Sequence, residues 1–326
     1  MRTEIASLSR STLCAVAAGA FIAGCGGSQP PISAPGAMPQ GRPIATQANR
    51  GGSGMAPEAK SGDLLYVSFE TSVHVYSYPQ LKAQHFLYGF RTALGLCADK
   101  AGNVWITDTG AGTIVEYAHG GSKPIATRNN KNRGFISCSV DPRTGNLAVP
   151  DDATTRNSRG DVAIYQPGRE RPLRYRIPAF NPLYCAYDDR GNLFVNGVNS
   201  ASALYFGELP YGSSKFISIT IPNGVDAVGA MQWDGQYLAV TNNVLSSTTP
   251  VYRLSIRGTK ARKVGVVRLS ADAALSALWI QGSTIIGSSI TYADVALWRY
   301  PRGGQPVKTI ANIPYPEGVA VSLAPH

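Results

Sequence analysis

One pattern recurs six times between residue 63 and the C-terminus, a short apolar strand that follows a glycine-containing turn in every copy except the first. Successive copies lie about 40 to 48 residues apart. Glycine and asparagine tolerate the positive φ that two-residue hairpin turns need, so each copy is predicted to be the second strand of a hairpin. The clear copies contain the turn dipeptide Gly-Asn and lie at 101–108, 144–151 and 190–196. The degenerate copies lie at 63–67, 234–242 and 281–287.

Three more strands accompany most copies. An apolar stretch that ends at an aspartate precedes them, as at 95–99, 137–141, 184–188 and 230–234. An alternating strand and then a fourth strand follow them, as at 113–117 and 124–127 and again at 251–254 and 264–269. Four short strands per period predict a propeller blade, and no stretch after residue 24 keeps a helical period for three turns. The fold expected is therefore an all-β, six-bladed β-propeller.

The first blade lacks an inner strand of its own, because the residues ahead of Asp63 are rich in Gly, Ser and Pro. Residues 317–322 have the sequence of an inner strand with no blade after it. We expect this segment to pair with residues 64–67, so that one blade is shared between the two ends of the domain. A closed ring leaves few free sheet edges.

The N-terminus predicts export. Arg2 and Arg10 precede an apolar run at 13–24 that is too short to span a bilayer, so residues 1–24 read as a signal peptide. The run ends in Ile22-Ala-Gly-Cys25, which resembles the bacterial lipobox. The resemblance implies a lipoprotein in which Cys25 carries a diacylglyceryl group as a membrane anchor. The alternative is an ordinary secretory signal with a chance cysteine.

Residues 25–62 are rich in Gly, Pro, Ser, Ala and Gln and hold few large apolar side chains, which predicts a disordered tether. Such a chain would hold the propeller, residues 63–326, on the order of 30 to 35 Å from the membrane. Gly26 rather than aspartate after the anchor favours the outer membrane. The expected location is thus the bacterial cell envelope, in the periplasm or at the cell surface.

Three cysteines remain once Cys14 leaves with the signal and Cys25 is lipidated. Cys97, Cys138 and Cys185 occupy nearly the same place in three successive inner strands. Neighbouring blades usually keep such positions farther apart than the roughly 7 Å between Cα atoms that a disulfide allows. We therefore expect three buried free thiols, with one disulfide or a thiol metal site as alternatives.

The net charge is +10 and becomes +9 without the signal, which removes Arg2, Arg10 and Glu4. Many basic residues lie at the turns between third and fourth strands, which predicts a basic ring on one face: Lys82, Lys123, Arg169, Arg171, Lys215, Lys260, Arg262, Lys263 and Arg302. The ring would attract an anionic partner or, as we favour, protect exposed outer strands. Nucleic acid is disfavoured because no stacking-aromatic motif accompanies the charges.

The phrases at 95–108 and 316–321 resemble the NHL-repeat and SMP-30/gluconolactonase group of six-bladed propellers. The resemblance implies a site in the channel mouth, where loops lead into inner strands and leave second strands. Candidate ligand-binding residues there are Arg91, Asp108, Arg133, Asp151, Asn181, Asn196, Asp226, Asn242 and Glu317. In SMP-30 lactonases a Glu, an Asn and an Asp bind a divalent metal. Glu317, Asn223 and Asp226 are the matching residues, and Ca²⁺ or Mg²⁺ would be the ion.

The function expected is a non-catalytic binding or scaffold module with no cofactor, monomeric, with a protein or glycan ligand in the envelope. The alternative is a metal-dependent lactonase or esterase. A lyase like the streptogramin-inactivating propellers would need a catalytic histidine. His74, His85, His119 and His326 all lie away from the inner-strand mouths. No catalytic residue is assigned.

Overall fold

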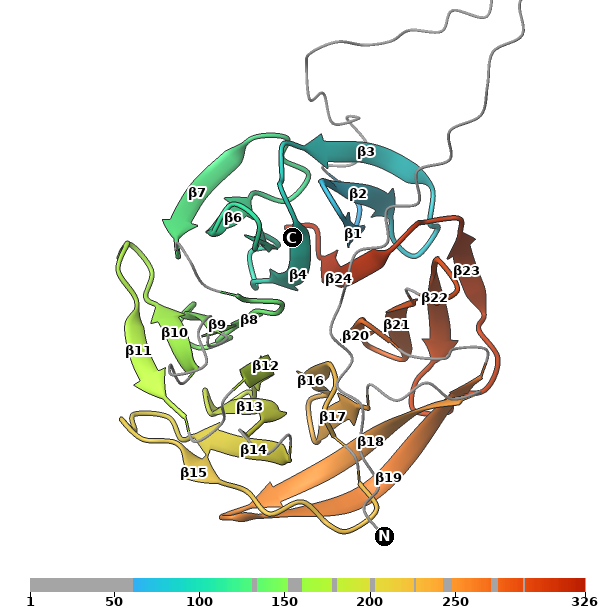
Figure 1. Cartoon of the computed structure of the whole chain (residues 1–326). Helices are drawn as coiled ribbons and strands as arrows, with labels where there is room; N and C mark the ends of the chain where they lie inside the picture. Colours follow the sequence, from blue (N-terminus) through green and yellow to red (C-terminus); the bar gives the residue numbers. More distant parts are fainter. Residues whose placement is uncertain are drawn as a thin grey trace, which may run out of the picture. The chain divides into compact units, whose positions relative to one another are not determined.

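The computed structural model describes residues 61–130, 134–151, 160–177, 181–199, 203–225, 227–242, 248–270, 275–289 and 291–325. These residues form six four-stranded antiparallel sheets that follow one another around a ring (Figure 1). The all-β, six-bladed β-propeller predicted from the repeats is confirmed. Across these ranges, no helix is long and apolar enough to cross a membrane.

Each blade is described from its innermost to its outermost strand. Blades 1 to 3 are β24 (Pro316–Ser322), β1 (Leu64–Phe69), β2 (Ser72–Ser77) and β3 (Ala83–Tyr88); β4 (Ala93–Ala98), β5 (Val104–Asp108), β6 (Thr113–Tyr117) and β7 (Pro124–Asn129); β8 (Ser139–Val140), β9 (Leu147–Asp151), β10 (Asp161–Tyr165) and β11 (Leu173–Arg176). Blades 4 to 6 are β12 (Asn181–Tyr187), β13 (Leu193–Val198), β14 (Leu204–Leu209) and β15 (Ile217–Ser218); β16 (Met231–Trp233), β17 (Leu238–Thr241), β18 (Thr248–Arg257) and β19 (Lys260–Ser270); β20 (Ala277–Gln281), β21 (Thr284–Ser289), β22 (Asp294–Arg299) and β23 (Lys308–Ala311).

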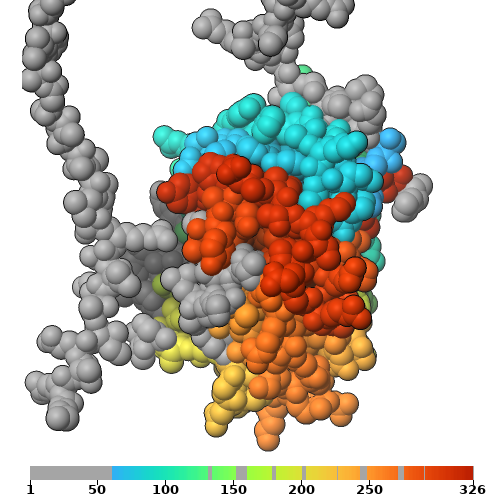
Figure 2. Space-filling view, turned by 90° about the vertical axis from the view of Figure 1, so that its right-hand side faces the viewer, coloured from blue at the N-terminus to red at the C-terminus, as the bar shows by residue number. Residues whose placement is uncertain are grey.

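Strand β24 closes the ring as the sequence predicted. It pairs antiparallel with β1, with Leu65 opposite Val321 and Val67 opposite Val319. Gly318 is required at this junction, because a Cβ there would lie 2.2 Å from the backbone oxygen of Leu94 in blade 2. In Figure 2 the strands of blade 6 (orange-red to red) lie between the strands that the N-terminal part of the ring gives to blade 1 (blue to cyan) and those of blade 5 (orange).

The turns between inner and second strands have the two residues we predicted in blades 5 and 6, but they are longer in blades 2 to 4. In blade 2, the backbone N–H of Asp99 donates to the oxygen of Asn103, which leaves three residues in the loop, and Gly102 takes the left-handed φ of 82°. The Asp99 carboxylate also accepts the Asn103 backbone N–H at 2.8 Å. Asp188 and Asn192 repeat this arrangement in blade 4. The repeated aspartate therefore belongs to the turn and supports its longer loop.

The core lies between neighbouring blades, since each sheet buries both faces against the next. Side-chain to backbone hydrogen bonds join successive blades at all six junctions: Ser68 to Leu94 O, Thr109 to Phe135 O, Ser137 to Leu183 O, Asn196 to Gly229 O, Gln232 to Ile280 O, and Ser288 to Glu317 O. Buried or half-buried polar residues near the inner strands thus satisfy backbone groups that the sheets leave unpaired.

The ring has two faces, which we name by their connections. The mouth face carries the loops that lead into inner strands and the loops between second and third strands. The turn face carries the hairpin turns between inner and second strands and those between third and outermost strands. The basic turn residues predicted to form a ring, Lys82, Lys123, Arg169, Arg171, Lys215, Lys260, Arg262, Lys263 and Arg302, are all exposed.

Candidate functional site

On the mouth face, Asp108 at the end of β5 holds a loop together. Its carboxylate is buried and accepts the backbone N–H groups of Arg91 (3.0 Å), Thr92 (2.8 Å) and Ala111 (3.2 Å). The Arg91 side chain, by contrast, is exposed. Both residues were predicted to bind a ligand, but only Arg91 presents its charge to solvent.

Asp151, at the end of β9, belongs to a polar network between blades 2 and 3. Its Oδ2 accepts a hydrogen bond from Arg174 Nη1 at 2.8 Å and another from Asn130 Nδ2 at 3.0 Å. Arg174 also pairs with Asp161 at 2.7 Å. Because Asp151 is fully buried beneath these partners, its charge is neutralised within the protein.

The three predicted asparagines lie in or next to strands. Asn196 is fully buried in β13, and its Nδ2 donates to the backbone oxygens of Ala227 at 2.7 Å and Gly229 at 2.8 Å. Asn242 follows β17 and is 8% exposed. The Oδ1 atoms of Asn196 and Asn242 are buried without a hydrogen-bond partner among the described residues. Asn181 opens β12, opposite Val198.

The residues matched to the SMP-30 metal site are separated or undescribed. Glu317 is partly buried in β24, whereas Asn223 is exposed in a turn closed by the Val225 N–H on Pro222 O. That turn lies beside Leu204 and Phe206 of β14, the third strand of blade 4. Arg133, Asp226 and Cys25 lie outside the described residues. Within those described, no three His, Cys, Asp or Glu side chains form a group that could hold a metal ion.

The turn face of blades 3, 4 and 5 is hollowed in three places that adjoin one another. The first hollow, about 390 Å³, lies between blades 3 and 4, and the second, about 440 Å³, lies between blades 4 and 5. A third hollow, of about 210 Å³, lies at this end of the channel. Tyr187 is shared by the first and third hollows, and Asp189 and Trp233 by the second and third.

Aromatic side chains and arginine shape the first hollow. Tyr175, Tyr187 and Tyr211 line it, and the Arg143 guanidinium lies 4.3 Å from the centre of the Tyr211 ring. Arg143 also donates from Nη1 to the backbone oxygen of Arg190 at 2.7 Å. This stacked pair bridges the turns of blades 3 and 4 and fixes the rim of the hollow.

The second hollow combines an indole ring with carboxylates. Trp233 donates from Nε1 to Asp189 Oδ2 at 2.8 Å, which orients the ring beside that carboxylate. Glu208, partly buried in β14, and Arg190 also line the hollow, and no ion pair joins Glu208 to a cation among the described residues. Burial, and secondarily the charge of Asp188, raises the pKa of Glu208. Glu208 is thus a carboxylate that a positively charged ligand would stabilise.

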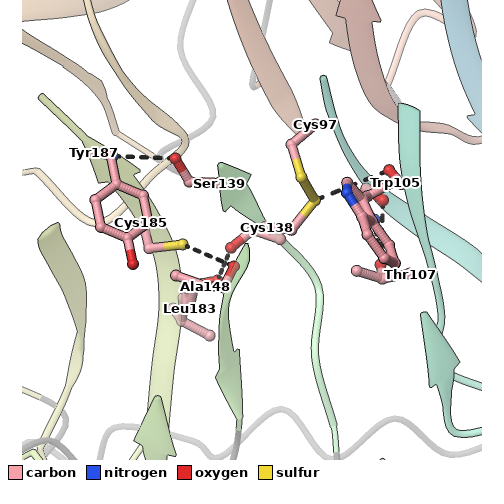
Figure 3. The surroundings of a disulfide bond; sticks show 11 residues. Cys97, Trp105, Thr107, Cys138, Ser139, Ala148, Leu183, Cys185 and Tyr187 are labelled. Atoms are coloured by element: carbon pink, nitrogen blue, oxygen red, sulfur yellow. Dashed lines mark hydrogen bonds between the residues drawn. A yellow bond between two sulfur atoms is a disulfide. The ribbon is translucent and has the colours of Figure 1, made fainter. Parts of the chain in front are cut away.

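The channel hollow exposes the error in our cysteine prediction. Cys97 and Cys138 form a disulfide with their Cα atoms 5.7 Å apart, and only Cys185 is a free thiol among the described cysteines (Figure 3). Cys97 stands two residues before its turn aspartate Asp99, whereas Cys138 stands three residues before Asp141. Since side chains alternate along a strand, this one-residue offset points the two sulfurs toward each other across the blade junction.

Cys185, like Cys138, stands three residues before its turn aspartate, so its side chain points back toward the preceding blade. There the Cys185 Sγ lies 3.7 Å from Ala148 O of blade 3. The position opposite it, equivalent to Cys97, is Ser139, whose Oγ accepts the Tyr187 N–H at 3.0 Å. Cys185 thus lies in a different blade junction from the disulfide (Figure 3). Burial raises the pKa of its thiol, so the protonated, unreactive form prevails.

Sequence reasoning missed the hollows because each is built from turns of different blades. A signal was nevertheless present at the position just before the turn aspartate. Blades 2 and 3 have Ala98 and Val140 there, whereas blades 4 and 5 have Tyr187 and Trp233. Large aromatic side chains at this repeat position mark the two blades that the hollows flank.

No protein-family model and no curated protein matches the sequence. Solved structures do match, and one is a chain from the crystal structure of a nidogen/laminin complex. The two chains superpose with a TM-score of 0.63 at 13% identity, over 81% of this chain and 100% of that one. At this identity the likeness supports the propeller fold alone.

Proposed function

We propose that this chain is a binding module of the bacterial cell envelope, exported by residues 1–24 and anchored in a membrane through lipid on Cys25. We place it with the propellers of the NHL-repeat and SMP-30-like group. The Cys97–Cys138 disulfide supports export, since such bonds persist in oxidising compartments. The nidogen/laminin complex offers a precedent for a propeller in a protein assembly.

The ligand site proposed is the second hollow, and Glu208 is the observation that carries it. A partly buried carboxylate with a raised pKa and no ion pair to a described cation gains free energy when a positive group arrives. Trp233 offers an aromatic face for the same group, and Asp189 a second carboxylate. The ligand that fits is a protein partner that inserts an arginine or lysine side chain.

The indole N–H signals of the full chain in detergent provide the test, because the sequence has only four tryptophans. Capped Gly-Arg-Gly should shift the Trp233 signal, which Trp233→Phe assigns, whereas Gly-Gln-Gly should not. Glu208→Gln should weaken this binding about tenfold, the cost of a lost charge-assisted contact. Glu116→Gln is the matched control, since burial also raises the pKa of Glu116 but Arg128 already compensates its charge.

A Trp233 signal that responds equally to the arginine and glutamine peptides would contradict the proposal. The same preparation, grown with a clickable fatty acid, should carry label that Cys25→Ala removes. The lactonase alternative has a separate signature, because a bound ion stabilises by mass action. It requires a rise in melting temperature with Ca²⁺ or Mg²⁺ that Glu317→Gln abolishes.

A further inference from the structure

The hairpin of β18 and β19 differs from every other hairpin of the described ring in length and charge. Its strands have 10 and 11 residues, whereas the other strands have at most seven. Residues 248–270 contain six Arg or Lys and no Asp or Glu. Arg253 pairs with Asp234, and the other five are exposed: Arg257, Lys260, Arg262, Lys263 and Arg268. We call these five residues the basic strip.

Contacts at both ends hold the hairpin in place. At its tip, Thr220 of blade 4 donates to Thr259 O at 2.8 Å and accepts the Ala261 N–H at 2.9 Å. At its other end, Gly304 of blade 6 exchanges backbone hydrogen bonds with Arg268 and Ser270, both at 2.8 Å. The hairpin therefore runs along the outer wall from blade 4 to blade 6 (Figure 1), and its side chains project from a fixed backbone.

Protection of a free sheet edge does not account for so many cations. The outermost strands of the other blades carry from none to two: none in β3 and β15, one in β7 and β23, and two in β11. Since β3 remains an edge strand without any charge, one or two cations suffice for an outer strand here. The concentration on β19 instead creates a strong local positive potential.

The strip suits a long, narrow anion. From Lys260 to Arg268 the strand extends about 26 Å, at about 3.3 Å per residue. None of the exposed large apolar side chains of the described ring falls within residues 248–270, so the hairpin lacks the wedge that membrane-surface elements insert among lipids. No ion pair joins any of the five to a described residue. We propose that the basic strip binds a linear acidic polysaccharide.

Polygalacturonate, with neutral dextran as control, is the probe for the full chain in detergent. Wild-type protein should bind polygalacturonate and lose at least tenfold in affinity between about 50 and 200 mM salt, since each contact releases a counterion. The variant Lys260→Gln, Arg262→Gln, Lys263→Gln should bind at least tenfold more weakly. The variant Lys82→Gln, Lys123→Gln, Arg302→Gln removes the same charge from exposed turns of blades 1, 2 and 6, and should lose less than threefold.

Three results would overturn the proposal: equal losses in the two variants, binding that salt leaves unchanged, or attachment to anionic phosphatidylglycerol vesicles without attachment to polygalacturonate. Melting temperatures within a degree of wild type would show that both variants fold. Binding of Gly-Arg-Gly at Trp233 is measured separately, so failure at the strip and failure at the hollow are distinguishable.

Discussion

The two faces of this propeller use polar residues in opposite ways. On the mouth face, Asp108, Asp151 and Asn196 are buried and form hydrogen bonds with other segments of the same protein. These three residues therefore hold the structure together. On the turn face, Glu208 and Trp233 border open hollows. A polar residue at the end of a propeller strand is therefore as well suited to holding the next blade as to holding a ligand, and only its contacts distinguish the two roles.

The largest effect expected from this contrast is on the mouth face. Asp108→Ala removes a buried acceptor of three backbone N–H groups and should lower the free energy of unfolding by about 2–4 kcal/mol. Urea denaturation would measure it, and Asp108→Asn, which keeps one oxygen, should lose less. Binding at the Trp233 hollow should survive in any folded fraction. An Asp108→Ala protein of unchanged stability would break the comparison.

The next effect concerns the inner strands near the turn face. The junction of blades 2 and 3 holds the disulfide, whereas the junction of blades 3 and 4 has Ser139 and Cys185 at the equivalent positions. Ser139→Cys should form a second disulfide with Cys185 and stabilise the oxidised protein by roughly 2–3 kcal/mol. Mass spectrometry after alkylation would show no free thiol in the folded domain, and reduction should abolish the gain. A thiol at Cys185 that remains alkylatable would show that the register argument is wrong.

The smallest expected effect is an electrostatic change in stability at Glu208, in the second hollow. Because the folded pKa of Glu208 is raised above its ordinary 4.5, the folded state holds this proton more tightly than the unfolded state does. Stability is consequently lost as pH rises through the window above 4.5. Glu208→Gln removes that loss and should stabilise the neutral protein by about 0.5 kcal/mol or less, with no gain in acid. Melting curves across pH would measure the difference, and a destabilised neutral variant would oppose the assignment.

The repeat was sufficient to predict the blades and their closure, because strand patterns are local and recur in every copy, and turn glycines recur in all copies but the first. Residues 64–67 and 317–322 could be paired because one lacked an inner partner and the other lacked a blade. The disulfide was missed because it depends on whether a cysteine precedes its aspartate by two residues or by three. The long hairpin was also missed, since the sequence indicated only its apolar segments, 251–254 and 264–269.

The candidate site was harder to predict, because a side chain's role depends on the groups that surround it in the folded structure. Asp108 and Glu208 are both carboxylates in or beside strands, and the sequence alone favoured Asp108. The structure reveals that three backbone N–H groups converge on Asp108, while Glu208 is partly buried without an ion pair to a described cation. Such differences arise from the loop backbone and the charges around each carboxylate, which a repeat pattern does not encode.

The pairing of β24 with β1 also sets an order of events during synthesis. The first blade begins with residues 64–69 but receives its inner strand only when residues 316–322 emerge, about 250 residues later along the chain. Until then blade 1 exposes an unpaired strand edge on a growing polypeptide. The nascent chain must therefore remain unaggregated until residues 316–322 have been made, which gives a holding chaperone a specific edge to shield.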